Sequence, residues 1–313
     1  MKSLARIAAL GLAALLAAEL GARLLIPMDA LVYRDSDDPA LAFELRPGSR
    51  GVKNGVSVEI NEQGLRDEIV PAAKAPGERR VVVVGGHETF GIGVEAKDTF
   101  VRELAEGLVA PGDGRARTVN LSMYSYHLGQ KVELACRKLP GMAAELVVLQ
   151  VSEDDAGSPK APLLHSTHLK NWVREHSVLA RWASEKFYLR HEHKSASHDD
   201  DFTETRAQLR RFKECIDATG ARAVVMMLPD LSEPTTSPSD LRRAIATDAK
   251  ELGLQMVDVG SELEAIPPKD RLVFPGKPFL SPAAHRVLAD ALRRRLKPLL
   301  KKRRAPAPPR PSV

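Results

Sequence analysis

The sequence predicts an α/β protein, a doubly wound three-layer sandwich around a five-stranded parallel sheet, preceded by one N-terminal membrane helix. Five apolar runs alternate with helical patterns, at 79–85, 117–122, 145–152, 222–229 and 254–260. These runs lack the every-second-residue alternation of a half-exposed strand, so both faces of each strand are expected to be buried. Strands that are covered on both faces and separated by helices are typical of a parallel sheet between two helical layers.

Five amphipathic helices are expected to follow these strands, at 99–108, 128–139, 202–220, 239–253 and 281–300. Gly220 marks the end of the third helix, Ser239 precedes the fourth as an N-cap, and Ser281-Pro282 opens the last. In doubly wound sheets, ligands bind beyond the carboxyl ends of the strands. A functional site is therefore expected just after the strands.

The first 27 residues, MKSLARIAALGLAALLAAELGARLLIP, are expected to form a membrane anchor or a signal segment. Lys2 and Arg6 precede an apolar run over 7–18, and Glu19 and Arg23 lie four residues apart, where they can pair on one helix face. The segment is long enough to span a bilayer. Because it lacks a clean small-x-small cleavage site, we favour an uncleaved anchor over a cleaved signal, with a cytosolic helix as the remaining alternative. The basic end stays in the cytoplasm, so the rest of the chain is exported.

The remaining chain divides into a lead-in segment at 28–78, a main domain at 79–300 and a basic, Pro-rich tail at 301–313 that is expected to be disordered. The lead-in contains short strands at most, such as VSVEI at 56–60. A helical insertion at 156–201 interrupts the main domain. Its apolar residues recur at helical spacing, which indicates a helix packed on the sheet edge or, alternatively, a lid or a lipid-contacting surface; we favour the first.

Charge and cysteine content narrow the class of protein. The 313 residues carry a net charge of +5, but nine basic and no acidic residues follow Asp290. Without those nine, 37 basic residues face 41 acidic ones, a net of −4. A mildly acidic body argues against nucleic-acid binding. Cys136 and Cys215 could pair in an oxidising compartment, although two cysteines in a long chain are more often unpaired, and the sequence leaves their pairing open.

Five short motifs occur in order along the chain, several of them at strand ends. They are NEQGLRDE at 61–68, VVVVGGHETFGIGV at 81–94, TVNLSMYSYHLGQ at 118–130, LVVLQVSEDD at 146–155 and FPGKPFLSPAAHRVLADAL at 274–292. Together they resemble the SGNH (GDSL) hydrolase superfamily, and more narrowly its bacterial membrane-anchored members, over about residues 30–298. The resemblance implies the flavodoxin-like sandwich predicted above. It also implies an ester hydrolase that acts on acyl groups of carbohydrates or lipids, with a serine nucleophile, a histidine base, an orienting aspartate and an oxyanion hole.

The residues at the family's catalytic positions are replaced in this sequence. The replacements are Gly86 (aspartate before the nucleophile), His87 (nucleophilic serine), Ser122 (second-block glycine), Asp154 (oxyanion-hole asparagine), Gly276, or Lys277 if the register shifts by one (aspartate), and Phe279 (histidine base). Without a hydroxyl or a base, no nucleophile can be activated. An ionised Asp154 would repel the oxyanion that an asparagine stabilises. His285 matches a histidine further along the last helix and not the base.

The residues that remain could form a new site. An imidazole beside carboxylates, such as His87 with Glu88, Asp154 and Asp155, could bind a metal or act as a base. We favour the simpler interpretation that His87 pairs with Asp154 in an inactive crevice, and we expect no metal or other cofactor. The expected crevice residues are Gly86, His87, Glu88, Ser122, Asp154, Asp155 and Phe279.

The sequence therefore favours a protein anchored in the inner membrane by a single pass, with its domain in the periplasm or another extracytoplasmic space. Its degenerate, pseudoenzyme-like site is expected to bind an acylated envelope carbohydrate or lipid, or to serve an envelope protein partner, and not nucleic acid. Two alternatives remain: an active ester hydrolase with a site rebuilt around His87 and Asp154, and a non-enzymatic scaffold. A crevice filled by Phe279 would favour the scaffold.

Overall fold

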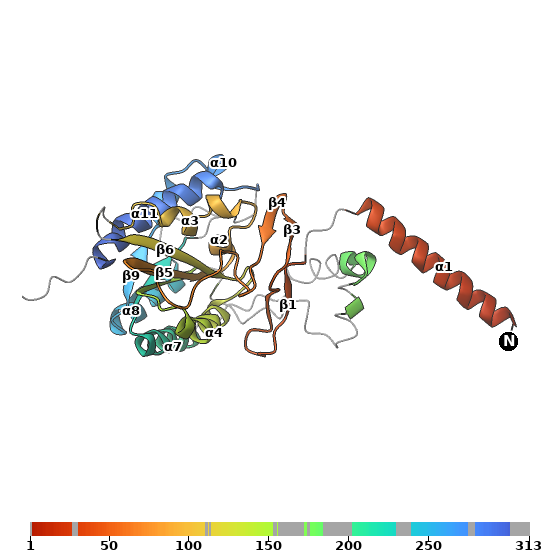
Figure 1. The fold of residues 1–313 in the computed structure, drawn as a ribbon, viewed down its shortest axis with the longest axis horizontal. Coiled ribbons are helices and arrows are strands. Elements are labelled where there is room, and N and C mark those ends of the chain that lie inside the picture. The colour runs from red at the N-terminus through yellow and green to blue at the C-terminus, as the bar shows by residue number, and fades with distance from the viewer. Residues whose placement is uncertain are drawn as a thin grey trace, which may run out of the picture.

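A five-stranded parallel sheet forms the centre of the computed structural model (Figure 1). The structure describes residues 1–313 except 1, 27–30, 110–111, 113, 153–154, 156–171, 174–175, 184–201, 230–238, 275–278 and 301–313. The strands are β5 (Glu78–Gly85), β6 (Arg115–Ser122), β7 (Leu146–Val151), β8 (Arg222–Met227) and β9 (Gln255–Asp258), in the order β6-β5-β7-β8-β9. This is the flavodoxin-like order, and it confirms the predicted sheet. The order reverses between β5 and β7, whose carboxyl ends therefore flank the expected ligand crevice.

Helices cover both faces of the sheet (Figure 1). One face packs against α4 (Leu128–Lys138), α7 (Thr203–Thr219) and α8 (Asp240–Glu251). The other packs against α3 (Phe100–Leu104), α9 (Gly260–Glu264) and α11 (Pro282–Leu300). Along β5, Val82 and Val84 belong to the first core and Val81 and Val83 to the second. This division explains why the strand is apolar without alternation: each side chain meets a helical layer, whichever face it occupies.

Apart from the N-terminal helix, the remaining described elements are short. Two antiparallel pairs precede the main sheet, β1 (Tyr33–Asp35) with β2 (Phe43–Leu45) and β3 (Arg50–Lys53) with β4 (Val56–Glu59). The other helical turns are α2 (His87–Phe90), η1 (Ala96–Asp98), η2 (Leu139–Gly141) and α10 (Pro268–Arg271). The expected strand at 56–60 is β4, whereas the helix expected at 99–108 is regular only over α3. Buried lead-in side chains, including Leu41, Phe43 and Ile60, join the core on the α4 side, so this segment packs onto the main domain.

The N-terminal helix α1 (Lys2–Leu25) projects away from the body (Figure 1). Its stretch Ala5–Leu25 is long and apolar enough to cross a membrane, and only 6% of its most apolar window is buried. Of the insertion, the described residues are 172–173 and 176–183. Residues 176–179 hydrogen-bond to Glu19 and Arg23 of α1 and so differ from the expected helix on the sheet edge. The tail at 301–313 lies outside the described residues.

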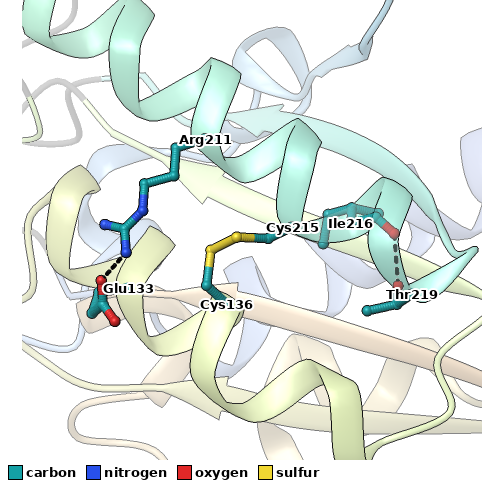
Figure 2. The surroundings of a disulfide bond; sticks show 6 residues. All are labelled: Glu133, Cys136, Arg211, Cys215, Ile216 and Thr219. Atoms are coloured by element: carbon teal, nitrogen blue, oxygen red, sulfur yellow. Dashed lines mark hydrogen bonds and ion pairs between the residues drawn. A yellow bond between two sulfur atoms is a disulfide. The ribbon is translucent and has the colours of Figure 1, made fainter.

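The two cysteines, whose pairing the sequence left open, form a disulfide bond (Figure 2). Cys136 of α4 and Cys215 of α7 are 79 residues apart in sequence, with their Cα atoms 5.3 Å apart. Because α4 and α7 are neighbours on one face of the sheet, both side chains meet where these helices touch. The ion pair between Glu133 and Arg211 joins the same two helices (Figure 2).

Candidate functional site

The turn after β5 is built around glycine. A Cβ atom at Gly85 would lie 2.6 Å from the side-chain oxygen of Gln150 and would also collide with Thr89, so no larger residue fits there. The same Gln150 oxygen accepts hydrogen bonds from the Gly86 N–H, at 2.7 Å, and from the Thr89 hydroxyl, at 3.1 Å. Gly91 then ends α2 with φ of +80°, a left-handed conformation that favours glycine. The backbone around His87 is therefore held in one geometry.

Arg66 of the lead-in segment fixes this turn from outside the sheet. Its guanidinium is buried and donates to the carbonyl oxygens of Phe90 at 2.8 Å, Gly91 at 2.6 Å and Val94 at 2.7 Å. Burial lowers the pKa of Arg66 to about 10, so the side chain stays charged at neutral pH. The NEQGLRDE motif thus supports the site. The sequence alone gave the motif no such role.

Two further residues connect the lead-in segment to the sheet. The Asp67 carboxylate accepts a hydrogen bond of 2.8 Å from the N–H of Asn120, and burial raises the pKa of that carboxyl. The Asn120 side chain donates to the Thr89 carbonyl oxygen at 2.8 Å. The Asn120 side-chain oxygen also accepts a hydrogen bond from the Ser122 hydroxyl. Ser122, which was predicted to line the crevice, is therefore buried and uses its hydroxyl inside the protein.

A buried ion pair lies directly beneath Gly86. The Nζ atom of Lys131, on α4, is 2.7 Å from the carboxylate of Asp155, and both side chains are at most 2% exposed. Asp155 also accepts from the Ser152 N–H at 2.8 Å. A Cβ atom at Gly86 would lie 3.3 Å from Nζ of Lys131, so the lysine occupies the space toward which a larger residue at position 86 would point. Lys131 was not predicted from the sequence, although a lysine on the apolar face of a helix indicates a buried charge that needs a partner.

An aromatic ring faces the residue at the nucleophile position. The rings of His87 and Phe279 have centroids 5.6 Å apart and are tilted by 50°. Phe274 packs edge-on against Phe279, with centroids 6.2 Å apart. Glu88, beside His87, is buried. His87 and Phe279, which the resemblance assigned to the nucleophile and base positions, therefore lie close together.

His285 lies in the core on the α11 side and not in this crevice. Its Nδ1 accepts a hydrogen bond of 3.1 Å from the N–H of Phe100, and its ring stacks on the Phe100 ring. Burial, with a smaller contribution from the charge of Arg66, lowers the pKa of His285 to about 3. The neutral imidazole therefore serves as an acceptor at the start of α3.

Six of the predicted crevice residues lie near the carboxyl ends of β5, β6 and β7 or on the segment before α11. They are Gly86, His87, Glu88, Ser122, Asp155 and Phe279. Asp154 and Gly276, with Lys277, lie outside the described residues. The structure therefore leaves open the predicted pairing of His87 with Asp154. Asp155, expected beside His87, is committed to Lys131. Within the described part of the chain, no group of three His, Cys, Asp or Glu side chains is placed to hold a metal ion.

A cavity of about 520 Å³, which the sequence did not predict, lies beside this turn. The lead-in segment, the β3–β4 hairpin and the η1–α3 region surround it. Seven of its lining residues are charged, and both signs are present: Glu59, Arg66, Asp67, Glu68, Glu95, Lys97 and Arg102. Its volume is within the range of small-molecule sites.

Comparisons with known proteins give matches among solved structures. No protein-family model and no curated protein matches the chain. A structure described as a putative lipolytic protein of the G-D-S-L family from Desulfitobacterium hafniense is 13% identical, with 69% of this chain and 98% of that chain covered at a TM-score of 0.46. The esterase EstA from Pseudoalteromonas sp. is 11% identical, with 71% and 98% covered at 0.48. The acetylxylan esterase Axe2 from Geobacillus stearothermophilus is 15% identical, with 70% and 94% covered at 0.44.

Proposed function

We propose that this chain, which has the α/β fold of the SGNH/GDSL hydrolases, is a membrane-anchored, exported protein that binds an envelope ligand or assembly partner and does not hydrolyse esters. The proposed ligand is an acylated carbohydrate or lipid. The proposed location is the inner membrane, with the domain on the outer side.

The packing of Phe279 against His87 is the observation that carries this proposal. Ester hydrolysis by the family's route needs a hydroxyl or thiol that a neighbouring base deprotonates. Here the nucleophile position holds an imidazole and the base position holds a hydrocarbon ring that cannot accept a proton. Lys131 adds a buried positive charge beneath the turn, and that charge is already neutralised by Asp155.

Two features support export with a retained anchor. Glu19 and Arg23 of α1 hydrogen-bond to residues 176–179, and a segment that is removed after export would have no reason to make such contacts. The disulfide between Cys136 and Cys215 fits an oxidising compartment, since cytosolic thiols are kept reduced.

The cavity beside Arg66 favours a ligand-binding role over a purely structural scaffold role. Its lining mixes charged and amide side chains with the apolar surfaces of Ile69 and Val101, a combination suited to a sugar with an acyl substituent. The scaffold remains the second candidate, because the ring of Phe279 occupies the space next to His87.

An esterase assay tests the central statement. The full chain, purified in mild detergent, would be incubated with aryl acetates and acetylated oligosaccharides beside a His87→Ala variant. We expect no turnover above buffer for either protein. Turnover that disappears in His87→Ala would establish the rebuilt-enzyme alternative, whereas turnover equal in both would point to chemistry away from His87.

Calorimetric titration with acetylated and unacetylated oligosaccharides separates the ligand-binding form of the proposal from the scaffold. We expect heat of binding that an Ile69→Trp substitution abolishes, because Ile69 lines the cavity and is 51% exposed, so a larger ring can enter the cavity without disturbing the core. A Val52→Trp control alters an exposed apolar position outside this lining and should leave binding unchanged. Absence of binding by the folded wild-type protein would favour the scaffold.

A further inference from the structure

The chain's two tryptophans both lie in the insertion, at positions 172 and 182. They are well exposed for large apolar side chains, at 58% and 39%, and Val173 beside the first is 36% exposed. The Trp172 ring stacks on His176, with centroids 4.7 Å apart. Exposed tryptophans in one short segment need an apolar or interfacial neighbour to remove them from water.

The same segment is attached to α1 through Glu19. The Glu19 carboxylate accepts hydrogen bonds from the Ser177 hydroxyl at 2.8 Å, the Val178 N–H at 2.9 Å and the Leu179 N–H at 3.1 Å. Arg23 pairs with Glu19 at 2.8 Å and donates to the His176 carbonyl oxygen at 2.5 Å. Glu19 thus caps the helical turns at 178–183, which places them beside the last two turns of α1.

The position of Glu19 along α1 sets the depth of this contact. Leu20, Leu24 and Leu25 follow Glu19 and are exposed, at 60%, 76% and 82%, so α1 remains apolar beyond the carboxylate. At about 1.5 Å per residue, Glu19 lies roughly 9 Å before the end of α1, and the whole Ala5–Leu25 stretch matches the roughly 30 Å hydrocarbon layer. An ionised side chain near the outer edge of a bilayer requires partners. Arg23 and residues 177–179 supply them.

We infer that residues 172–173 and 176–183 belong to an interfacial element in the outer leaflet of the bilayer, with Trp172 and Trp182 among the lipid headgroups and upper acyl chains. The inference rests on the proposed membrane anchor and adds a second contact with lipid. Tryptophan concentrates at this depth because its ring is apolar while its N–H still finds a polar partner. Because Glu19 lies roughly 9 Å before the end of α1, its contacts hold the element at the level of the upper acyl chains. They also keep the domain close to the membrane surface.

Tryptophan fluorescence reports on this element alone, since the chain has no other tryptophan. The full chain would be reconstituted into phosphatidylcholine–phosphatidylglycerol vesicles with and without lipids brominated at carbons near the headgroup. We expect the brominated lipids to remove roughly half of the emission or more, and aqueous iodide to quench little, as for interfacial rings. Trp172→Phe and Trp182→Phe variants assign the signal to each ring.

A Glu19→Ala variant tests the attachment. We expect its emission to lose sensitivity to brominated lipid and gain sensitivity to iodide, whereas Glu106→Ala, an exposed carboxylate on the domain, should match the wild-type protein. Carbonate extraction of the same vesicles reports separately on the anchor. A wild-type chain that resists extraction but is quenched by iodide and not by brominated lipid would overturn the inference and leave the anchor intact. A chain released by carbonate would overturn both, and Glu19→Ala behaving like wild type would overturn the role of Glu19.

Discussion

At the residue scale, buried polar side chains hold the turn that follows β5 in one geometry. Gln150 fixes Gly86 and Thr89, Arg66 fixes the end of α2, and Lys131 lies below the turn in contact with Asp155. Each of these groups has hydrogen-bonding partners, as burial demands. They stabilise the crevice geometry without supplying a nucleophile or a base.

Removing one partner of the Lys131–Asp155 pair is expected to be strongly destabilising. Lys131→Met leaves Asp155 buried without its counter-ion, which should lower the free energy of unfolding by about 3–5 kcal/mol. The double variant Lys131→Met, Asp155→Leu removes both charges and should recover part of that loss. Urea unfolding measures all three proteins. A single variant within about 1 kcal/mol of wild type would contradict the structural role given to this pair.

The buried His285 predicts a pH dependence of stability. Its pKa is about 3 in the folded chain against an ordinary value of 6.5, so between these values the unfolded chain binds a proton that the folded chain does not. Its contribution is therefore fully present above pH 6.5 and is lost as the pH falls toward 3, by up to about 1.4 kcal/mol per pH unit.

His285→Asn tests this because the asparagine oxygen can still accept from the Phe100 N–H but does not titrate. Unfolding in urea at pH 7, 6 and 5 would be compared for the two proteins. We expect the wild-type protein to lose stability more steeply than the variant over that range. Parallel slopes would show that His285 is not the titrating group.

At the element scale, the disulfide joins two helices of one layer. It closes a 79-residue loop between α4 and α7 that includes β7, the insertion and the start of α7. In the chain-entropy treatment, a loop of this length stabilises the folded state by about 4 kcal/mol.

Cys136→Ser combined with Cys215→Ser should lower the free energy of unfolding by up to that amount. Thermal unfolding with and without reductant measures the effect: reductant should lower the melting temperature of the wild-type protein to that of the double variant and leave the variant unchanged. An equal effect of reductant on both proteins would indicate that the bond does not form.

At the scale of the whole molecule, the charges at the start of α1 should set its orientation. Lys2 and Arg6 precede the apolar stretch, and positive residues stay on the cytoplasmic side. In intact spheroplasts, protease added outside should degrade the wild-type domain. Replacing both residues by glutamate should leave a larger fraction of the chain protected. Equal protection of wild type and variant would contradict the proposed topology.

Much of the fold was predictable because it depends on local patterns. The apolar run at 79–85 and its glycine end specify a buried strand and a tight turn without reference to distant residues. The motifs likewise placed His87 and Phe279 at the positions that the resemblance assigns to a nucleophile and a base, and this assignment remains a prediction. The short regular part of α3 was not predictable, because the pattern over 99–108 does not show where packing ends the helix.

Local patterns in the sequence were sufficient to predict the sheet, its two helical layers and the apolar N-terminal helix, since each follows from residues that are near one another in the chain. Only the tertiary structure decided that Cys136 pairs with Cys215, that Lys131 neutralises Asp155 beneath Gly86, and that Glu19 holds residues 177–179. The physical reason is that these contacts join distant parts of the chain, and their distances are set by how helices and loops pack and not by any periodicity in the sequence.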